Sequence, residues 1–211
     1  MFTKDRAFLF SNIAAFLNYG ATFTVGYLLS IYLQVVMGFP SQIAGLILIV
    51  QPAMQALFSP SMGKLSDRVA PYKLASIGMS LCVAGLMLLS LLKLDTHLAF
   101  VIVILVLMGL GFAVFSSPNV NAIMSRVEPK DFAVANSIVA TMRTLGQTSS
   151  MAVVTIVTGV MVGNTALAEV PKEDLMRTIH VIFVIFIFIC IAGVFFSVSR
   201  GKGAAAKDKQ E

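Results

Sequence analysis

The chain runs from Ala7 to Gly63 without a single charged side chain, and this stretch restricts its possible folds more than any other feature. It is far longer than the apolar region of about 7–15 residues in a cleavable signal peptide. A transmembrane helix needs about 20 apolar residues. Because Gly38 and Pro40 mark a turn inside the stretch, it predicts two membrane-spanning helices, over about residues 8–36 and 43–62.

More apolar segments follow at about residues 74–92, 98–117, 132–163 and 178–198, and the chain ends in a polar, basic cytoplasmic tail at 199–211. Overall, 58% of the residues are hydrophobic and only 12% are charged, whereas a soluble domain has about 25% charged residues. Lipid is therefore the expected solvent, and a segment in lipid must satisfy its backbone polar groups internally. The sequence predicts an all-α integral membrane protein with six transmembrane helices.

Positive charges are divided unequally between the two sides of these helices. Eleven of the fifteen Lys and Arg residues lie in the N-terminus, the tail and the loops on their side, and three lie in the loops on the other side. An excess of Lys and Arg marks cytoplasmic loops. We therefore expect both termini to be cytoplasmic, and we expect a multi-pass protein of the cell membrane, whether an inner or a plasma membrane.

The remaining basic residue, Arg143, interrupts the fifth apolar segment. It lies roughly 16 Å into a helix that begins at Phe132, near the middle of a hydrocarbon core about 30 Å thick. A charge at this depth normally faces a bundle interior or a wet cavity. Helical phase places Asn136, Gln147 and Ser150 on the same face. Two interpretations remain open, a substrate pathway or gate and an anchor that ties helices together. We expect the guanidinium to bond to a carbonyl or amide of the first two spans, or to an acid from outside this chain.

The first two spans carry further polar side chains. In the first span these are Asn18, Tyr19, Tyr27 and Gln34, close to one arc of the helix, and in the second they are Gln51 and Gln55, one helical turn apart. Each of them can either bond between helices or line a cavity. Because three spans carry such groups, a shared cavity is favoured.

One spacing occurs twice, since the pair Gln51 and Gln55 matches the pair Arg143 and Gln147. Two three-span repeats would place these pairs opposite each other across a pseudo-two-fold axis. The third and sixth segments contain few polar side chains, which predicts that they lie against lipid.

The sequence contains no motif for nucleophilic catalysis, metal binding or phosphate binding. Cys82 and Cys190 lie inside apolar segments and are expected to be packed thiols. Neither His97 nor His180 has a partner at metal-ligand spacing. The net charge of +5 comes from short clusters between apolar segments, without interleaved aromatic residues. We expect no enzyme activity, no cofactor, no metal and no nucleic-acid partner.

The loop between the second and third spans, GKLSDRVAPYK, resembles the cytoplasmic signature loop of the major facilitator superfamily. Gly63, Asp67 and Arg68 match that pattern, and Lys73 is the one base left at its end. Ala70 stands where the pattern has glycine, and Pro71 and Tyr72 stand where the pattern has basic residues.

Residues 17–34, 109–124 and 135–152 are similar to the C-terminal half of the fourteen-span drug:proton antiporters of that superfamily. This resemblance implies one six-helix half-bundle of the major facilitator fold. It also implies a half or fragment that contributes to proton-coupled efflux of drugs or other amphipathic small molecules by alternating access. By the same resemblance, Asp67 contacts the positive N-terminal end of the helix that begins at Phe132.

All ten Asp and Glu residues lie in loops, termini or span edges. A proton-coupled carrier needs a titratable group in its cavity, and Arg143 does not deprotonate. We therefore expect three partners: the lipid bilayer, a small amphipathic or cationic substrate, and another half of six to eight spans or a second copy that supplies the acid. The alternative is a non-transporting membrane fragment, scaffold or regulatory subunit that needs a partner half.

Overall fold

The structure, a computed structural model, describes residues 6–163, 167 and 169–207, and it describes residues 6, 7 and 200–207 by their backbone alone. Residues 208–211 of the predicted tail lie outside the described residues.

Six segments of the described chain are helical, long enough and apolar enough to cross a membrane. The first comprises α1 (Arg6–Thr22), α2 (Val25–Ile31) and a π-helical turn, η1 (Tyr32–Val36), and the second comprises α3 (Ser41–Leu48) and α4 (Val50–Ser66). The third and fourth are α5 (Pro71–Leu89) and α6 (Leu98–Met124). A short 3-10 helix, η2 (Pro129–Asp131), leads into α7 (Phe132–Met161), and α8 (Lys172–Lys207) contains the sixth. The prediction of an all-helical protein with six transmembrane helices is confirmed.

Glycine and proline set several of the helix ends. Gly38 precedes α3 with φ of 76°, and Gly163 follows α7 with φ of 68°, both in the left-handed region that favours glycine. Pro71 opens α5, where the N–H that proline lacks has no helical partner. The chain therefore reverses where the sequence has its turn residues.

The first span is not one regular helix. A turn at Phe23 and Thr24 separates α1 from α2, and η1 then winds with the wider π-helical turn. Both irregularities shift the helical phase, so side chains spaced for a single α-helix do not share one face. The predicted arc from Asn18 to Gln34 is broken for this reason: Asn18 is fully buried, whereas Gln34 is exposed.

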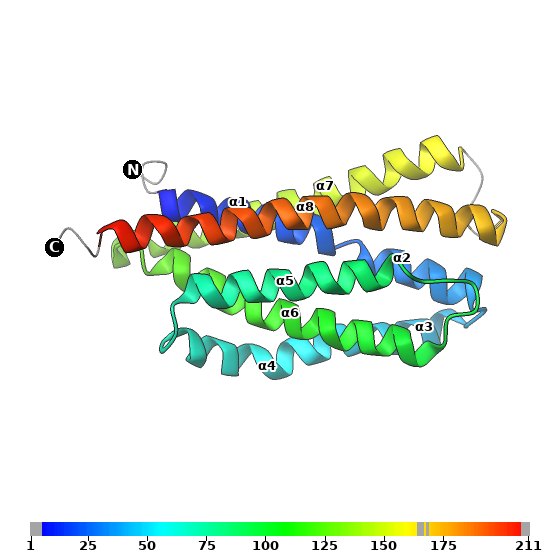
Figure 1. The fold of residues 1–211 in the computed structure, drawn as a ribbon, viewed down its shortest axis with the longest axis horizontal. Helices are drawn as coiled ribbons and strands as arrows, with labels where there is room; N and C mark the ends of the chain where they lie inside the picture. Colours follow the sequence, from blue (N-terminus) through cyan, green and yellow to red (C-terminus); the bar gives the residue numbers. More distant parts are fainter. Residues whose placement is uncertain (1–5, 164–166, 168, 208–211) are drawn as a thin grey trace.

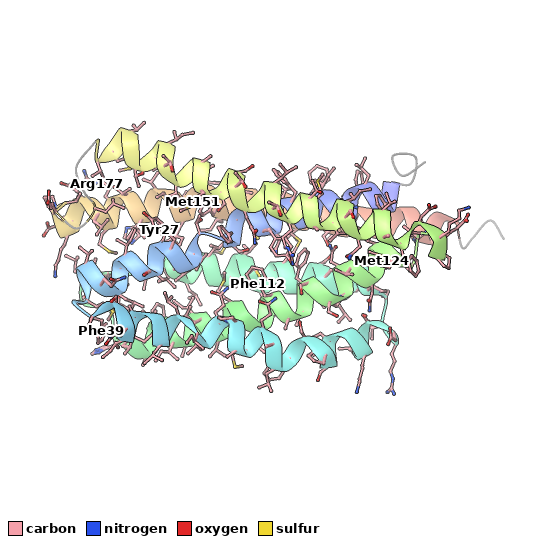
Figure 2. All side chains as sticks on the ribbon, turned by 180° about the vertical axis from the view of Figure 1, so that it is seen from behind. Tyr27, Phe39, Phe112, Met124, Met151 and Arg177 are labelled. Carbon is pink, nitrogen blue, oxygen red and sulfur yellow. The ribbon has the colours of Figure 1, made fainter. Side chains whose placement is uncertain are left out.

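The helices form two groups of three. α6 packs between α4 and α5, and α1 packs between α7 and α8. Contacts of α5 with α8 and of α1 with α6 join the groups (Figure 1). As a result, α5 and α8 form one side of the bundle, and α4 and α7 lie on the opposite side. Figure 2, turned by 180° from Figure 1, shows the side of α4 and α7.

Burial differs from the expectation for the third span. Half of the most apolar 18-residue segment of α5 is buried, because α5 packs against both α6 and α8. In contrast, only 6% of the corresponding segment is buried in the second span and 17% in the fifth. The second and fifth spans are therefore more exposed within the half-bundle than the third, because α5 packs its apolar side chains against α6 and α8.

The principal helix contacts have an internal symmetry. They remain the same when α1 is exchanged with α6, α4 with α7, and α5 with α8. This is the pattern of two three-helix repeats related by a pseudo-two-fold axis. Gln51 on α4 and Arg143 on α7 thus lie on corresponding helices, as their common spacing predicted.

A second repeated pattern lies where α5 and α8 meet. The sequence Cys-x-Ala-Gly occurs once on α5, ending at Gly85, and once on α8, ending at Gly193. A side chain at Gly85 would collide with Met108 of α6, and one at Gly193 would collide with Met79 of α5 and come within 3.1 Å of Leu17 of α1. Each glycine thus lies at a close helix contact, and the contacts with α6 and α1 involve corresponding helices.

Candidate substrate pathway

Arg143 lies on the α7 face that the rest of the half-bundle leaves exposed. Its guanidinium carbon is 5.9 Å from the centroid of the Tyr19 ring of α1, a cation–π distance. Within the described residues the partner is thus an aromatic ring of the first span, rather than a carbonyl or amide, and the alternative of an acid from outside this chain stays a prediction. In the described part of the chain, Arg143 has no ion pair.

The ring beneath Arg143 belongs to an aromatic cluster from two helices. The centroid of the Tyr19 ring is 6.0 Å from that of Phe112 and 6.3 Å from that of Phe115, both on α6. Phe115 is fully buried, and Phe112 is buried nearly as deeply. The cluster therefore fixes Tyr19, and through it the plane over which the cation sits.

The predicted polar stripe of α7 runs from the open face into a helix interface. Asn136 is exposed, Gln147 is half-buried and Ser150 is buried. The hydroxyl oxygens of Ser150 and Thr24 are 2.8 Å apart, which is a hydrogen bond between α7 and the break in the first span. In this half-bundle, Ser150 connects helices, while Asn136 and Arg143 face outward.

The predicted polar residues of the first span separate in the same way. Asn18 is fully buried, and its side-chain oxygen lies 3.9 Å from the sulfur of Cys190 on α8. Its amide nitrogen has no hydrogen-bond partner among the described residues. Tyr27 and Gln34 are exposed, and the Gln34 amide donates a hydrogen bond to the Ser30 hydroxyl at 2.8 Å.

Gln51 and Gln55 are half-buried on α4. A side chain at Gly109 of α6 would meet the Gln51 carbonyl at 2.5 Å, so the two backbones approach closely there. On α7, Gly146 lies between Arg143 and Gln147 and approaches α1 in the same manner. Each polar pair therefore lies beside a close contact between corresponding helix pairs, with the glycine on α6 in one and on α7 in the other.

The α4 and α7 sides carry large exposed apolar residues around these polar groups (Figure 2). Examples with more than half of their surface exposed are Leu57, Ile156 and Val160. A single cation within such an apolar face needs water or a counter-charge. Apart from these few polar groups, the exposed residues of this face are therefore largely apolar.

The signature loop is attached to α6. The Ser66 hydroxyl donates to the Gly63 carbonyl at 2.7 Å and accepts a hydrogen bond from the Asn121 amide at 2.5 Å. Asp67, Arg68 and Lys73 are exposed, as charged loop residues are expected to be. The bond to Asn121 was not anticipated, because nothing in the sequence of the loop indicates its partner on α6.

The implied contact between Asp67 and the start of α7 stays a prediction. α4 packs on α6 and α3, whereas α7 packs mainly on α1. Within the described residues, the Asp67 carboxylate has neither a hydrogen bond nor an ion pair.

Residues 12–211 match the family model of the Major Facilitator Superfamily. The chain belongs to this superfamily, as its signature loop and six spans predicted. The superfamily consists of membrane transporters and not of enzymes, so the expectation that the chain is not an enzyme is also confirmed.

Three curated relatives are transporters by name. The chain is 34% identical over 142 residues to "Riboflavin transporter RibZ" of Clostridioides difficile (strain 630), an alignment that covers 67% of this chain and 31% of that protein. It is 33% identical over 126 residues to "Uncharacterized transporter YebQ" of Escherichia coli (strain K12), covering 60% of this chain and 28% of that protein. It is 27% identical over 139 residues to "Uncharacterized MFS-type transporter YhcA" of Bacillus subtilis (strain 168), covering 64% and 26%. The alignments thus span less than a third of each relative.

Proposed function

We propose that this chain forms one wall of an alternating-access pathway for a small amphipathic molecule, and that another half of six to eight spans, or a second copy, forms the opposite wall. The observation that carries the proposal is the exposed Arg143 over the ring of Tyr19, on the least buried side of the half-bundle. An ionised group at membrane depth marks a pathway more often than a structural contact.

The expected direction is outward, coupled to protons, as the resemblance to drug:proton antiporters implies. The described spans contain no carboxylate at the depth of Arg143, so the proton-carrying acid belongs to the opposite wall. Arg143 then acts on that acid, or it changes hydrogen-bond partners between the inward-open and outward-open states. A fixed cation repels a cationic drug, so holding a cation is not its task.

A planar aromatic solute such as a flavin is the second candidate substrate. RibZ, which carries the name of a riboflavin transporter, aligns with two thirds of this chain. Arg143 is exposed over the ring of Tyr19, and a guanidinium stacks well on flat π-systems. A neutral or anionic flat molecule suits this surface better than a cation.

The test is efflux from cells that hold the chain in its native assembly. Riboflavin and a planar cationic dye are loaded, and their release is compared between cells with the chain, cells without it, and cells with Arg143→Ala at matched abundance. Slower release of at least one compound in both altered strains supports a pathway. Unchanged release of every compound after removal of the chain contradicts it and favours the scaffold alternative.

A further inference from the structure

An open cavity of about 540 Å³ lies at the end of the bundle where α5 finishes and α8 begins, far from Arg143 in sequence and on the opposite side from α4 and α7. Its walls come from residues 92–95, which follow α5, and from the first turns of α8. By the distribution of positive charge, this end faces outward.

Two hydrogen bonds hold the wall that follows α5. The His180 ring nitrogen Nε2 lies 2.7 Å from the Leu92 carbonyl and donates to it. The Tyr32 hydroxyl donates to the Lys93 carbonyl, also at 2.7 Å. The segment is therefore tied to α8 on one side and to the first span on the other, so the cavity has fixed walls.

The charged groups around the cavity are of both signs and are not paired with each other. Lys93 and Arg177 contribute cations, Asp95 and Glu173 contribute carboxylates, and all four are exposed. In the described part of the chain, none of these four side chains forms an ion pair. Two cations and two carboxylates around one space fit a ligand that itself carries a positive and a negative group.

The apolar part of the cavity continues into the membrane. Leu92 and Met176 form a buried floor, and Val181 lies exposed at the mouth. From Arg177 the exposed positions of α8 follow a helical stripe, which consists of Arg177, Val181, Val184, Phe188, Ile191 and Phe195. A charged group heads a long apolar stripe, which is the profile of an amphiphile with acyl chains.

We propose that this cavity binds a phospholipid whose headgroup carries a primary ammonium, as in phosphatidylethanolamine. Arg177 and Lys93 bind the phosphate, since a guanidinium pairs well with phosphate oxygens. Asp95 and Glu173 accept hydrogen bonds from the ammonium group, and the acyl chains lie along the apolar stripe of α8. A quaternary choline has no N–H to donate, and a phosphatidylglycerol headgroup has no cation for the carboxylates.

The chain contains no Trp, so a single introduced Trp is a unique reporter. Val181→Trp places it at the mouth of the cavity, and Leu46→Trp places a control on the exposed face of α3, near the same end of the bundle. The purified full chain is reconstituted in vesicles with phosphatidylethanolamine, phosphatidylcholine or phosphatidylglycerol brominated on the acyl chains, each at the same mole fraction. Quenching of Trp fluorescence then reports the relative association of each lipid.

At position 181, we expect phosphatidylethanolamine to associate at least about threefold more strongly than phosphatidylcholine, the ratio for one average membrane hydrogen bond. At position 46, the lipids should quench alike. Adding Asp95→Asn and Glu173→Gln should reduce the ratio at position 181 to about one, whereas Asp174→Asn, the adjacent acid outside the cavity, should leave it unchanged. Equal quenching by all three lipids at position 181, a preference for phosphatidylglycerol, or an equal preference at position 46 would each overturn the proposal.

Discussion

At the scale of single residues, Arg143 owes its position to a contact between two helices. The sequence correctly placed it with Asn136 on one face of the fifth span, because helical phase depends on one helix alone. It did not indicate the Tyr19 ring as the partner, because that depends on how α1 crosses α7. The crossing is set by the close approach of Gly20 and Gly146, which no polarity pattern reveals.

The Arg143→Lys variant should still fold, but the native assembly should lose most of its transport activity. Lysine keeps the positive charge but lacks the planar set of donors of the guanidinium. Arg143→Ala should be equally or more impaired. Gln147→Ala should have a milder effect, since an average side-chain hydrogen bond in a membrane contributes about 0.6 kcal/mol. The measurement is efflux at matched membrane abundance. Transport by Arg143→Lys close to that of the wild type would make this residue a structural anchor.

Gly146→Ala should destabilise the packing of α1 on α7. Its methyl group would lie 2.5 Å from the Phe16 carbonyl oxygen, and overpacking of this kind costs about 1–3 kcal/mol. Gly159→Ala is the matched control on the same helix, since a methyl group there meets no atom within 4 Å. The midpoint of thermal unfolding in detergent should fall for Gly146→Ala only. Equal midpoints would show that α1 and α7 can move apart to accommodate the methyl group without a loss of thermal stability.

At the scale of helices, the number and order of the spans were predictable and their irregularities were not. Long uncharged segments identify membrane helices because a bilayer excludes most charges. Neither residue of the break, Phe23 or Thr24, is a glycine or proline that would indicate it in the sequence. It is accompanied by the hydrogen bond between Thr24 and Ser150, a tertiary contact between residues far apart in the sequence. The burial of Asn18 and Ser150 could therefore not be predicted from one helix.

The signature loop gives a prediction that separates stability from transport. Asp67 is exposed and unpaired within the described half, so Asp67→Asn should change the stability of the isolated chain by no more than about 0.5 kcal/mol. In the native assembly the same variant should slow efflux, because the carboxylate that the resemblance places at the N-terminal end of the helix beginning at Phe132 would be lost. Ser66→Ala is the contrasting variant. It removes the partner of Asn121 and should lower thermal stability even in the isolated chain. Normal efflux by Asp67→Asn would show that this form of the loop has no gating role.

At the scale of the whole molecule, the division into two three-helix repeats was only weakly visible in the sequence. Two pairs of polar residues at equal spacing indicated it, and the helix contacts support it. The repeated Cys-x-Ala-Gly pattern becomes meaningful only once α5 and α8 are seen to correspond. A short pattern is common by chance, and only its position in space distinguishes a repeat from a coincidence.

Orientation in the membrane is the next property of the whole chain to test. Single cysteines at Ser41 and Glu169, both exposed at the end predicted to face outward, should react with a membrane-impermeant reagent in intact cells. A cysteine at Arg68, exposed beside the signature loop, should react only after permeabilisation. The native Cys82 and Cys190 are buried within the bundle and should stay unreactive. Labelling at position 68 in intact cells would reverse the orientation.

Proton coupling requires a titratable group in the spans, which this chain does not supply by itself. All ten of its acids lie in loops, termini or span edges, and no acid is available to accompany Arg143 at membrane depth. Because arginine stays protonated, the chain has no group in its spans that can load a proton on one side and release it on the other. The purified chain in vesicles should therefore not accumulate riboflavin or dye when a proton gradient is imposed, and dissipating the gradient with a protonophore should change nothing. Accumulation that the protonophore abolishes, with no other protein present, would contradict this prediction and would place the coupling group within these 211 residues.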